Sequence, residues 1–495
     1  MKKLLIITLP ICALFASCTK HITDLNNNPK GPASDIPATA LFLQGEKSLV
    51  DVCTSTSVST SPFRVIAQSW TENTYVYEAQ YNFSAYQAPD GFWNYIYAGP
   101  VYNPGVTPPG TGVLNNLIAA KLAWPVDVVD TGVLHNDLII TDLLEIYAYD
   151  LLVATYGNIP YSQAESTSTP FPKYDDQKTV YYDLLSRLDT CIAGLNINSG
   201  AMGTADQIYG GNVANWLKFA ASLKLKMAML IANTDPATAA QKVKEAVSTG
   251  VFASNTDNAL FAYDKSSPLN SNPMWNALVY SGRHDFCPTN LLVGTLDSLS
   301  DPRLTLYVTT DPNGNYTGGV PGAGNGYPLF SDFSAAMEAP DYAGDILDYS
   351  QTEFWLAEAV ERGMTGVSGT AESHYDNAIT ASIEFWGGTA AQAQTYLLQP
   401  TVAYTTAGGT WQQKIGYQSW LALYNGNWDT WTEIRRLGYP DLDVINPPIG
   451  AQGNLPLRFT YPTNEQTSNS VNWKAAAQTL PGGQDVVSAK LFWMP

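Results

Sequence analysis

The chain has 495 residues, of which 45% are hydrophobic, 12% aromatic and only 14% charged. A chain of this length and composition can bury a large core, and we expect two or more lobes. Its formal net charge of −19 argues against binding to nucleic acid or anionic lipid, because either ligand needs a basic patch. Thirteen Trp and 29 Tyr beside so few charges indicate a surface that meets an uncharged ligand, although solubility alone also explains the acidic balance.

The first eighteen residues, MKKLLIITLPICALFASC, have the pattern of a secretory signal. Lys2 and Lys3 precede an apolar run that is too short to span a bilayer as a helix. The ending resembles a bacterial lipobox, which implies cleavage after residues 1–17 and lipid on the sulfur of Cys18. The alternative is an ordinary signal peptide with a coincidental cysteine. Residues 18–37 are rich in Asn and Pro and predict an extended tether that leads away from the lipid.

Apolar residues recur at helical spacing in four pairs of segments. The most regular pair has stripes at 417–424 and 428–437, separated by a tight turn. In that turn we expect Gly426 to take the left-handed conformation and the side chain of Asn427 to cap the second helix. The other stripes are 140–154 with 181–195, 216–230 with 239–247, and 356–360 with 375–386.

Helical hairpins of this kind cannot bury their apolar faces alone, so they stack on one another. The sequence therefore predicts a mainly α fold of four tetratricopeptide-like helical hairpins within one domain, 38–495. The hairpins are expected at about 136–253 and 350–442, with an irregular, loop-rich cap at about 254–349 and little β structure. A short β-hairpin is expected near 304–309.

Residues 64–102 are dense in aromatic side chains that follow neither the helical nor the strand period for long, with amides and carboxylates interleaved. A flat ring can cover the C–H face of a sugar while amides and carboxylates bind its hydroxyls, although most aromatic residues in any protein are core. The cap offers a second group, because inserts on a rigid scaffold often carry binding residues. Its candidates are Trp275, Tyr280, Arg283, Asp285 and Tyr316.

No enzyme signature is found: the chain has four histidines but no His-Glu-x-x-His pair, nucleophile elbow or Walker loop. The segment 311–315 resembles a calcium loop, but its glycine is at the fourth position, which favours a plain turn. Cys53, Cys191 and Cys287 match no metal or redox motif and are expected to be buried, with one disulfide left open. We expect no catalysis and no cofactor, while a structural calcium stays open.

Several motifs follow one another along the chain. They are ITDLNNNP after Cys18, then YGNIPYSQA, SLSDPRL, FWLAEAVERG, WLALYNGNWDTWTEIRRLGYPDL, LRFTYPTNE and GGQD. Together they resemble the SusD/RagB family of outer-membrane nutrient-binding lipoproteins. The resemblance covers nearly the whole mature chain and is most specific from Trp420 to Pro495.

The resemblance implies a mostly α fold, a lipid-anchored position on the outer face of the outer membrane, and glycan binding without catalysis. It also implies a partner, a TonB-dependent transporter of the SusC type, and no contact with nucleic acid. By analogy of region, the ligand-binding residues are Trp70, Trp93, Asn94, Tyr95, Trp275 and Tyr280, to which the cap adds Arg283 and Asp285.

Three alternatives stay open. The ligand could be a peptide or another non-glycan nutrient, since the family also contains such members. A glycoside hydrolase would also suit an acidic, aromatic chain, but no acid pair stands out and four helical pairs are too few for a closed double ring of helices. A scaffold facing the periplasm could use the helical pairs for protein contacts alone.

Overall fold

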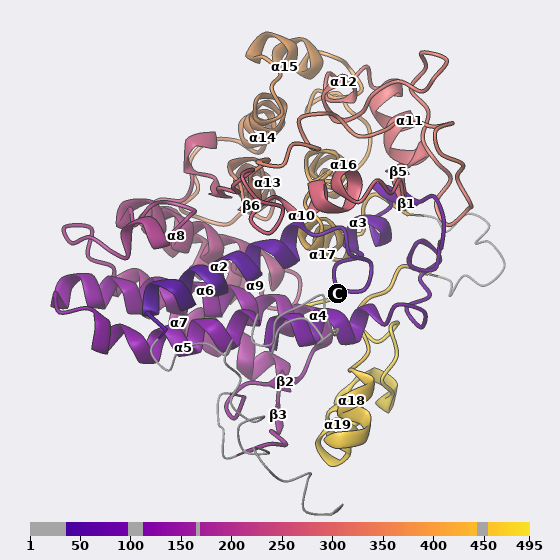
Figure 1. Ribbon diagram of the computed structural model, residues 1–495. Helices are drawn as coiled ribbons and strands as arrows, with labels where there is room; N and C mark the ends of the chain where they lie inside the picture. Colours follow the sequence, from indigo (N-terminus) through magenta and orange to yellow (C-terminus); the bar gives the residue numbers. More distant parts are fainter. Residues whose placement is uncertain (1–35, 98–111, 165–168, 443–453) are drawn as a thin grey trace, which may run out of the picture. The chain divides into compact units, whose positions relative to one another are not determined.

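The computed structural model describes residues 36–97, 112–164, 169–442 and 454–495 of the chain (Figure 1). The predicted signal peptide, Cys18 and most of the predicted tether lie outside these residues. Within the described ranges helices predominate and every strand is short. No helix in this part of the chain is both long and apolar enough to cross a membrane.

Four helical pairs form the scaffold, and the two helices of each pair pack against each other. The pairs are α6 (Thr131–Tyr156) with α7 (Gln177–Gly194), α8 (Val213–Leu230) with α9 (Pro236–Thr249), α13 (Tyr349–Glu361) with α14 (Ala371–Phe385), and α16 (Trp411–Ala422) with α17 (Trp428–Leu437). Helix α8 also packs on α13, which joins the second pair to the third (Figure 1). The predicted mainly α fold with four helical hairpins is confirmed.

Polar caps explain where these helices begin. In seven of the eight paired helices a side-chain oxygen just before the first turn accepts from free N–H groups of that turn. The capping residues are Asp130, Asp176, Asn212, Asp235, Asp348, Thr370 and Thr410. The helix starts are therefore set locally, before any long-range contact forms.

The eighth helix, α17, corrects two predictions about its turn. Asn427, not Gly426, has the positive φ of 51°, and its side chain makes no cap hydrogen bond. Its Nδ2 instead donates to the Cys53 carbonyl at 2.9 Å. Gly426 serves close packing, because a Cβ there would lie 2.8 Å from Leu423 Cδ2 and 2.9 Å from Thr430 Oγ1.

Helices near the N-terminus extend the scaffold and were not predicted. Helix α2 (Ala38–Thr54) packs along α5 (Val113–Asp127), and α5 packs on α6. The Ala38 amide donates to Asp127 Oδ2 at 2.7 Å, which fixes the start of α2 against the end of α5. The aromatic segment, expected to follow no regular period for long, contains α3 (Phe63–Ile66), β1 (Trp70–Glu72), η2 (Glu78–Gln80) and α4 (Ala88–Tyr97).

Residues 254–349 contain only short elements. These are η4 (Asn255–Asp257), β4 (Ala259–Phe261), α10 (Pro273–Trp275), the π-helix η5 (Asn276–Tyr280), β5 (Phe286–Pro288), α11 (Asn290–Ser298), α12 (Leu304–Tyr307) and β6 (Gly344–Leu347). The expected β-hairpin near 304–309 is wrong, because α12 occupies this place. Three two-stranded antiparallel sheets occur in the described residues: β1–β5, β4–β6, and β2 (Ile159–Pro160) with β3 (Tyr174–Asp175).

The C-terminal tail closes the core beside the first and last helical pairs. Arg435 of α17 is buried, with its guanidinium carbon 3.3 Å from the ring centroid of Trp431 and 4.8 Å from that of Trp493. It donates to the carbonyls of Ala154 and Leu457 and so links the tail to α6. The remaining elements are η3 (Gly203–Ala205), α15 (Ala390–Leu397), α18 (Thr463–Ser468), α19 (Ser470–Thr479) and η6 (Pro481–Gly483).

Candidate functional site

The two-stranded sheet β1–β5 joins two segments that are far apart in the sequence. Glu72 at the end of β1 faces Phe286 at the start of β5, so the chain leaving β1 meets the chain entering β5. The Asn73 amide donates to the Asp285 carbonyl at 2.6 Å. Its side-chain Nδ2 donates to the carbonyls of His284 and Phe286 at 2.9 and 3.1 Å. Backbone hydrogen bonds therefore hold both segments in place.

A third segment is attached to the same sheet. The Asn325 amide donates to the Asn73 carbonyl at 3.1 Å, and its side chain donates to the Glu72 carbonyl at 3.1 Å. The Gln80 side chain donates to the Gly322 carbonyl at 2.9 Å. Residues 73–86, 275–285 and 320–327 thus form one connected region at the end of a short sheet.

This region gathers exposed rings, which we call the aromatic surface. Its members are Tyr75, Tyr77, Tyr86, Trp275, Tyr280, His284 and Tyr327. Tyr280 is 64% exposed and stacks on Trp275, with ring centroids 5.2 Å apart at 29°. The ring of Tyr327 stacks on that of His284, with centroids 3.7 Å apart and an angle of 4° between the ring planes. Because stacked rings have already lost their freedom, they can meet a flat ligand face at little further cost in conformational entropy.

An ion pair adjoins these rings. Arg283 Nε lies 2.6 Å from Asp285 Oδ2, and Nη2 lies 3.0 Å from Oδ1, so the carboxylate occupies one edge of the guanidinium. The hydrogen bonds and negative charge of Asp285 raise the pKa of Arg283. The nearby Tyr75 and Tyr86 raise it further. The arrangement offers hydrogen-bond donors and acceptors within reach of ring faces, as sugar hydroxyls require.

Two buried carboxyl groups lie beneath the aromatic surface. Glu72 is 3% exposed and Glu78 is fully buried, and the two carboxyl groups influence each other's pKa. Glu72 Oε2 also accepts from the Ala79 amide at 3.1 Å. Burial raises the pKa of both groups, and the neighbouring Glu72 raises that of Glu78 further. Both acids therefore hold their protons more tightly than free carboxyl groups do.

An open cleft lies next to Tyr86. It has a volume of about 440 Å³ and is lined in part by Ser84, Gln87, Asp90 and Gln466. Its lining mixes side-chain amides, hydroxyls and the ring of Tyr461. The cleft therefore extends the candidate site toward α4 and the C-terminal tail.

Two predicted ligand residues are core residues instead. Trp70 is 1% exposed and packs on Phe333, with ring centroids 4.2 Å apart. Trp93 is 5% exposed and lies among tyrosines, edge-on to Tyr156 at 4.9 Å and stacked on Tyr174 at 5.9 Å. Large rings that make such contacts cannot reach a ligand, so we leave both tryptophans out of the candidate site.

The other predicted residues fall into two groups. Asn94 and Tyr95 are half-buried on α4, which packs on α2, α5 and α6. Trp275, Tyr280, Arg283 and Asp285 lie together before β5, as predicted for the cap. Tyr316 is half-buried and packs against the apolar core of the cap.

Sequence reasoning missed five members of the aromatic surface: Tyr75, Tyr77, Tyr86, His284 and Tyr327. It preferred tryptophans, yet the larger ring is more often buried on average. A usable signal was present, since Tyr75 and Tyr77 follow the polar run Glu72–Thr74 and no helical or strand period places them in a core. Nothing in the sequence announces the stacking of His284 on Tyr327.

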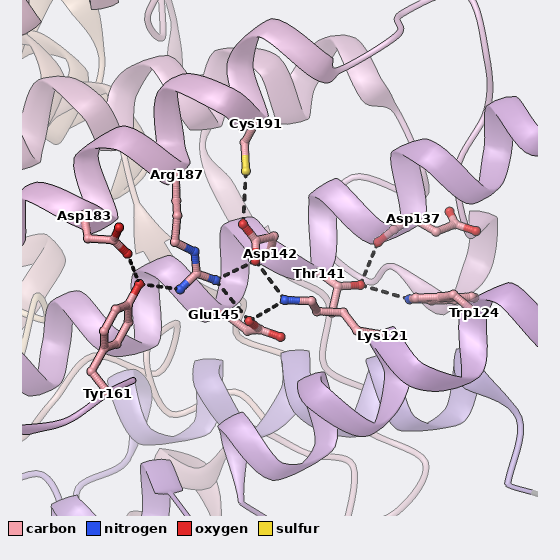
Figure 2. A network of polar contacts seen from close by, with 10 residues as sticks. All are labelled: Lys121, Trp124, Asp137, Thr141, Asp142, Glu145, Tyr161, Asp183, Arg187 and Cys191. Carbon is pink, nitrogen blue, oxygen red and sulfur yellow. Dashed lines mark hydrogen bonds and ion pairs between the residues drawn. The ribbon is translucent and has the colours of Figure 1, made fainter. Parts of the chain in front are cut away.

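A second polar cluster joins α5, α6 and α7 (Figure 2). Lys121 and Arg187 come from the outer helices and both bond Asp142 and Glu145 of α6. Burial alone would raise the pKa of Asp142, but the two cations outweigh it and lower that pKa. The Cys191 thiol donates to Asp142, and burial beside this carboxylate raises the pKa of Cys191. A thiol held protonated is no nucleophile, so the cluster links helices.

The structure also bears on the cysteines and on metal binding. Cys53, Cys191 and Cys287 are free, so the disulfide that the sequence left open is not formed. Asp311 accepts from the amides of Asn313 and Asn315 at 2.8 and 3.0 Å, which is the predicted turn. The described residues contain no group of three or more His, Cys, Asp or Glu side chains that could hold a metal ion.

The four helical pairs define a helical scaffold of the tetratricopeptide-like type, and the aromatic surface lies on the segments outside them. A profile of the SusD-like family, described as "Starch-binding associating with outer membrane", matches residues 29–462. The chain belongs to this family. No curated protein sequence matches the chain.

Solved structures share this fold. A chitin-binding protein is 23% identical, with a TM-score of 0.75, over 92% of this chain and 100% of its own. A SusD homologue from Bacteroides fragilis NCTC 9343 is 23% identical, with a TM-score of 0.76, over 93% of this chain and 99% of its own. An outer-membrane protein of Bacteroides vulgatus ATCC 8482, linked to nutrient binding, is 22% identical, with a TM-score of 0.75, over 93% of this chain and 100% of its own.

Proposed function

We propose that this protein is a lipid-anchored outer-membrane protein that captures oligosaccharide or polysaccharide at the cell surface and delivers it to a TonB-dependent transporter of the SusC type. It performs no catalysis and needs no cofactor. The aromatic surface carries this proposal, because its stacked, exposed rings and adjacent ion pair suit the C–H faces and hydroxyls of sugars. Membership of a family described as starch-binding and associated with the outer membrane supports it.

Binding to a panel of glycans tests the capture step. Calorimetry and affinity gels should show weak binding to at least one polymer, and Tyr280→Ala or Tyr327→Ala should weaken it. Tyr417→Ala is the matched control, because Tyr417 is similarly exposed but lies on α16, outside the aromatic surface. If no glycan binds and a peptide pool does, the ligand is a peptide; release of oligosaccharide products would indicate a hydrolase instead.

Cell-surface exposure and the transporter are tested separately. Protease added to intact cells should cut the protein if it faces the exterior, whereas a scaffold facing the periplasm would be protected. Cys18→Ser should release the protein from the membrane fraction. Co-purification from detergent should yield a barrel-sized outer-membrane partner, and its absence in repeated preparations would count against delivery to a transporter.

A further inference from the structure

The basic side chains around the aromatic surface are few, and each already has partners. Residues 55–97 and 254–349 contain four lysine or arginine residues: Arg64, Lys265, Arg283 and Arg303. Arg64 is buried and donates to carbonyls, among them that of Ser55 at 2.8 Å. Arg303 is fully buried and forms an ion pair with Asp301, in which Nη2 lies 2.6 Å from Oδ2. Neither of these two arginines can reach a ligand.

The two exposed cations of these segments are each paired with an aspartate. Lys265 lies 2.7 Å from Asp341, and Arg283 is held at two points by Asp285. Arg283 is the cation that adjoins the aromatic surface, and its side chain is 59% exposed. With Asp285 beside it, this exposed guanidinium contributes no net positive charge.

Acidic groups outnumber the cations at this place. Asp332 and Glu338 lie near Tyr327, and the Glu72–Glu78 pair lies beneath the surface. An anionic polymer would therefore meet more negative than positive charge at this place.

We infer that the aromatic surface selects uncharged over acidic polysaccharides, and that Asp285 sets this choice by occupying Arg283. The inference rests on the proposed function, since it names the class of glycan that the same site takes. The guanidinium presents a planar fork that matches a carboxylate, so a free Arg283 beside stacked rings would suit uronic acids well. In the native protein Asp285 occupies the Nε/Nη2 edge and neutralises the guanidinium, so the ion pair offers hydrogen bonds to hydroxyls but no net positive charge to a carboxylate.

The test compares one polymer in two charge states. The neutral polymer that binds best in a glycan panel is partly carboxymethylated, and both forms are measured by calorimetry with the full mature chain. The native protein should bind the carboxymethylated form at least about tenfold more weakly than the neutral form, and Asp285→Asn should recover most of that loss. The double variant Asp285→Asn with Arg283→Met should lose the recovery.

Asp341→Asn is the matched control, because it frees the other exposed cation of the cap, Lys265, from its aspartate, and it should recover nothing. Thermal melts verify that each variant is folded. Equal or tighter binding of the carboxymethylated polymer by the native protein would overturn this inference and leave glycan capture standing. Binding of no polymer in either form would remove the proposed function and this inference together.

Discussion

Two arginine–aspartate pairs, each near tyrosine, are used in opposite ways by the scaffold and by the cap. Arg187 is largely buried between helices, where it bonds Asp142, Glu145 and the Tyr161 hydroxyl (Figure 2). Arg283 and Asp285 form a comparable pair beside exposed rings. In the scaffold every contact is made within the protein and adds stability. On the cap the same chemistry faces outward, where it can contribute to binding but little to folding.

The largest expected effect is a loss of stability at Trp93, which was predicted to bind ligand but lies in the core. Trp93→Ala should lower the free energy of unfolding by about 3–5 kcal/mol, because it leaves a cavity among packed tyrosines. Chemical denaturation measures this loss. Below the unfolding transition, glycan binding should stay within twofold of the native value; a selective loss of binding in a fully stable variant would show that Trp93 belongs to the ligand site.

The ion pairs themselves give the next comparison. Arg187→Met should cost about 2 kcal/mol of stability, since it leaves the buried Glu145 with one cation fewer in a partly exposed cluster. Arg283→Met, the same substitution in the exposed pair, should cost less than about 0.5 kcal/mol. Urea titrations of the two variants give both values. Similar losses in both would mean that the cap pair is as structural as the scaffold pair.

The buried acids beneath the aromatic surface predict a dependence on pH. Burial raises the pKa of Glu72 to about 7, and it raises that of Glu78 as well, so the folded chain binds more protons than the unfolded chain above about pH 4.5. Their contribution to stability is therefore present at low pH and is lost as pH rises through the raised pKa values.

Glu78→Gln should flatten this decline, because the side-chain amide of glutamine does not titrate. We expect the difference in unfolding free energy between the variant and the native protein to change by about 1 kcal/mol between pH 5 and pH 8. Glu372→Gln removes an exposed carboxylate of α14 and serves as the control. Parallel stability curves for native protein and Glu78→Gln would contradict the raised pKa of Glu78.

The smallest effect is expected at the exposed rings. Tyr280→Ala removes one stacking face and should weaken glycan binding by about 1 kcal/mol, or roughly fivefold, with little change in stability. Calorimetry measures the change in affinity and a thermal melt measures the change in stability. A large drop in melting temperature without loss of affinity would place Tyr280 with the scaffold residues.

The scaffold could be predicted from the sequence, whereas most of the aromatic surface could not. Helical period and local caps report on residues a few positions apart, as the stripe 428–437 shows, so they predict helical pairs well. The aromatic surface depends on contacts between residues more than 200 positions apart, such as Asn73 with His284. The sequence favoured Trp70 over Tyr75 as a ligand residue for the same reason. The burial of Trp70 depends on distant partners such as Phe333, which no local pattern reports.

The pairing of β1 with β5 also determines when the protein becomes competent to bind. Residues 70–72 can pair only after residues 286–288 have been made, so an incomplete chain that lacks β5 cannot form the aromatic surface.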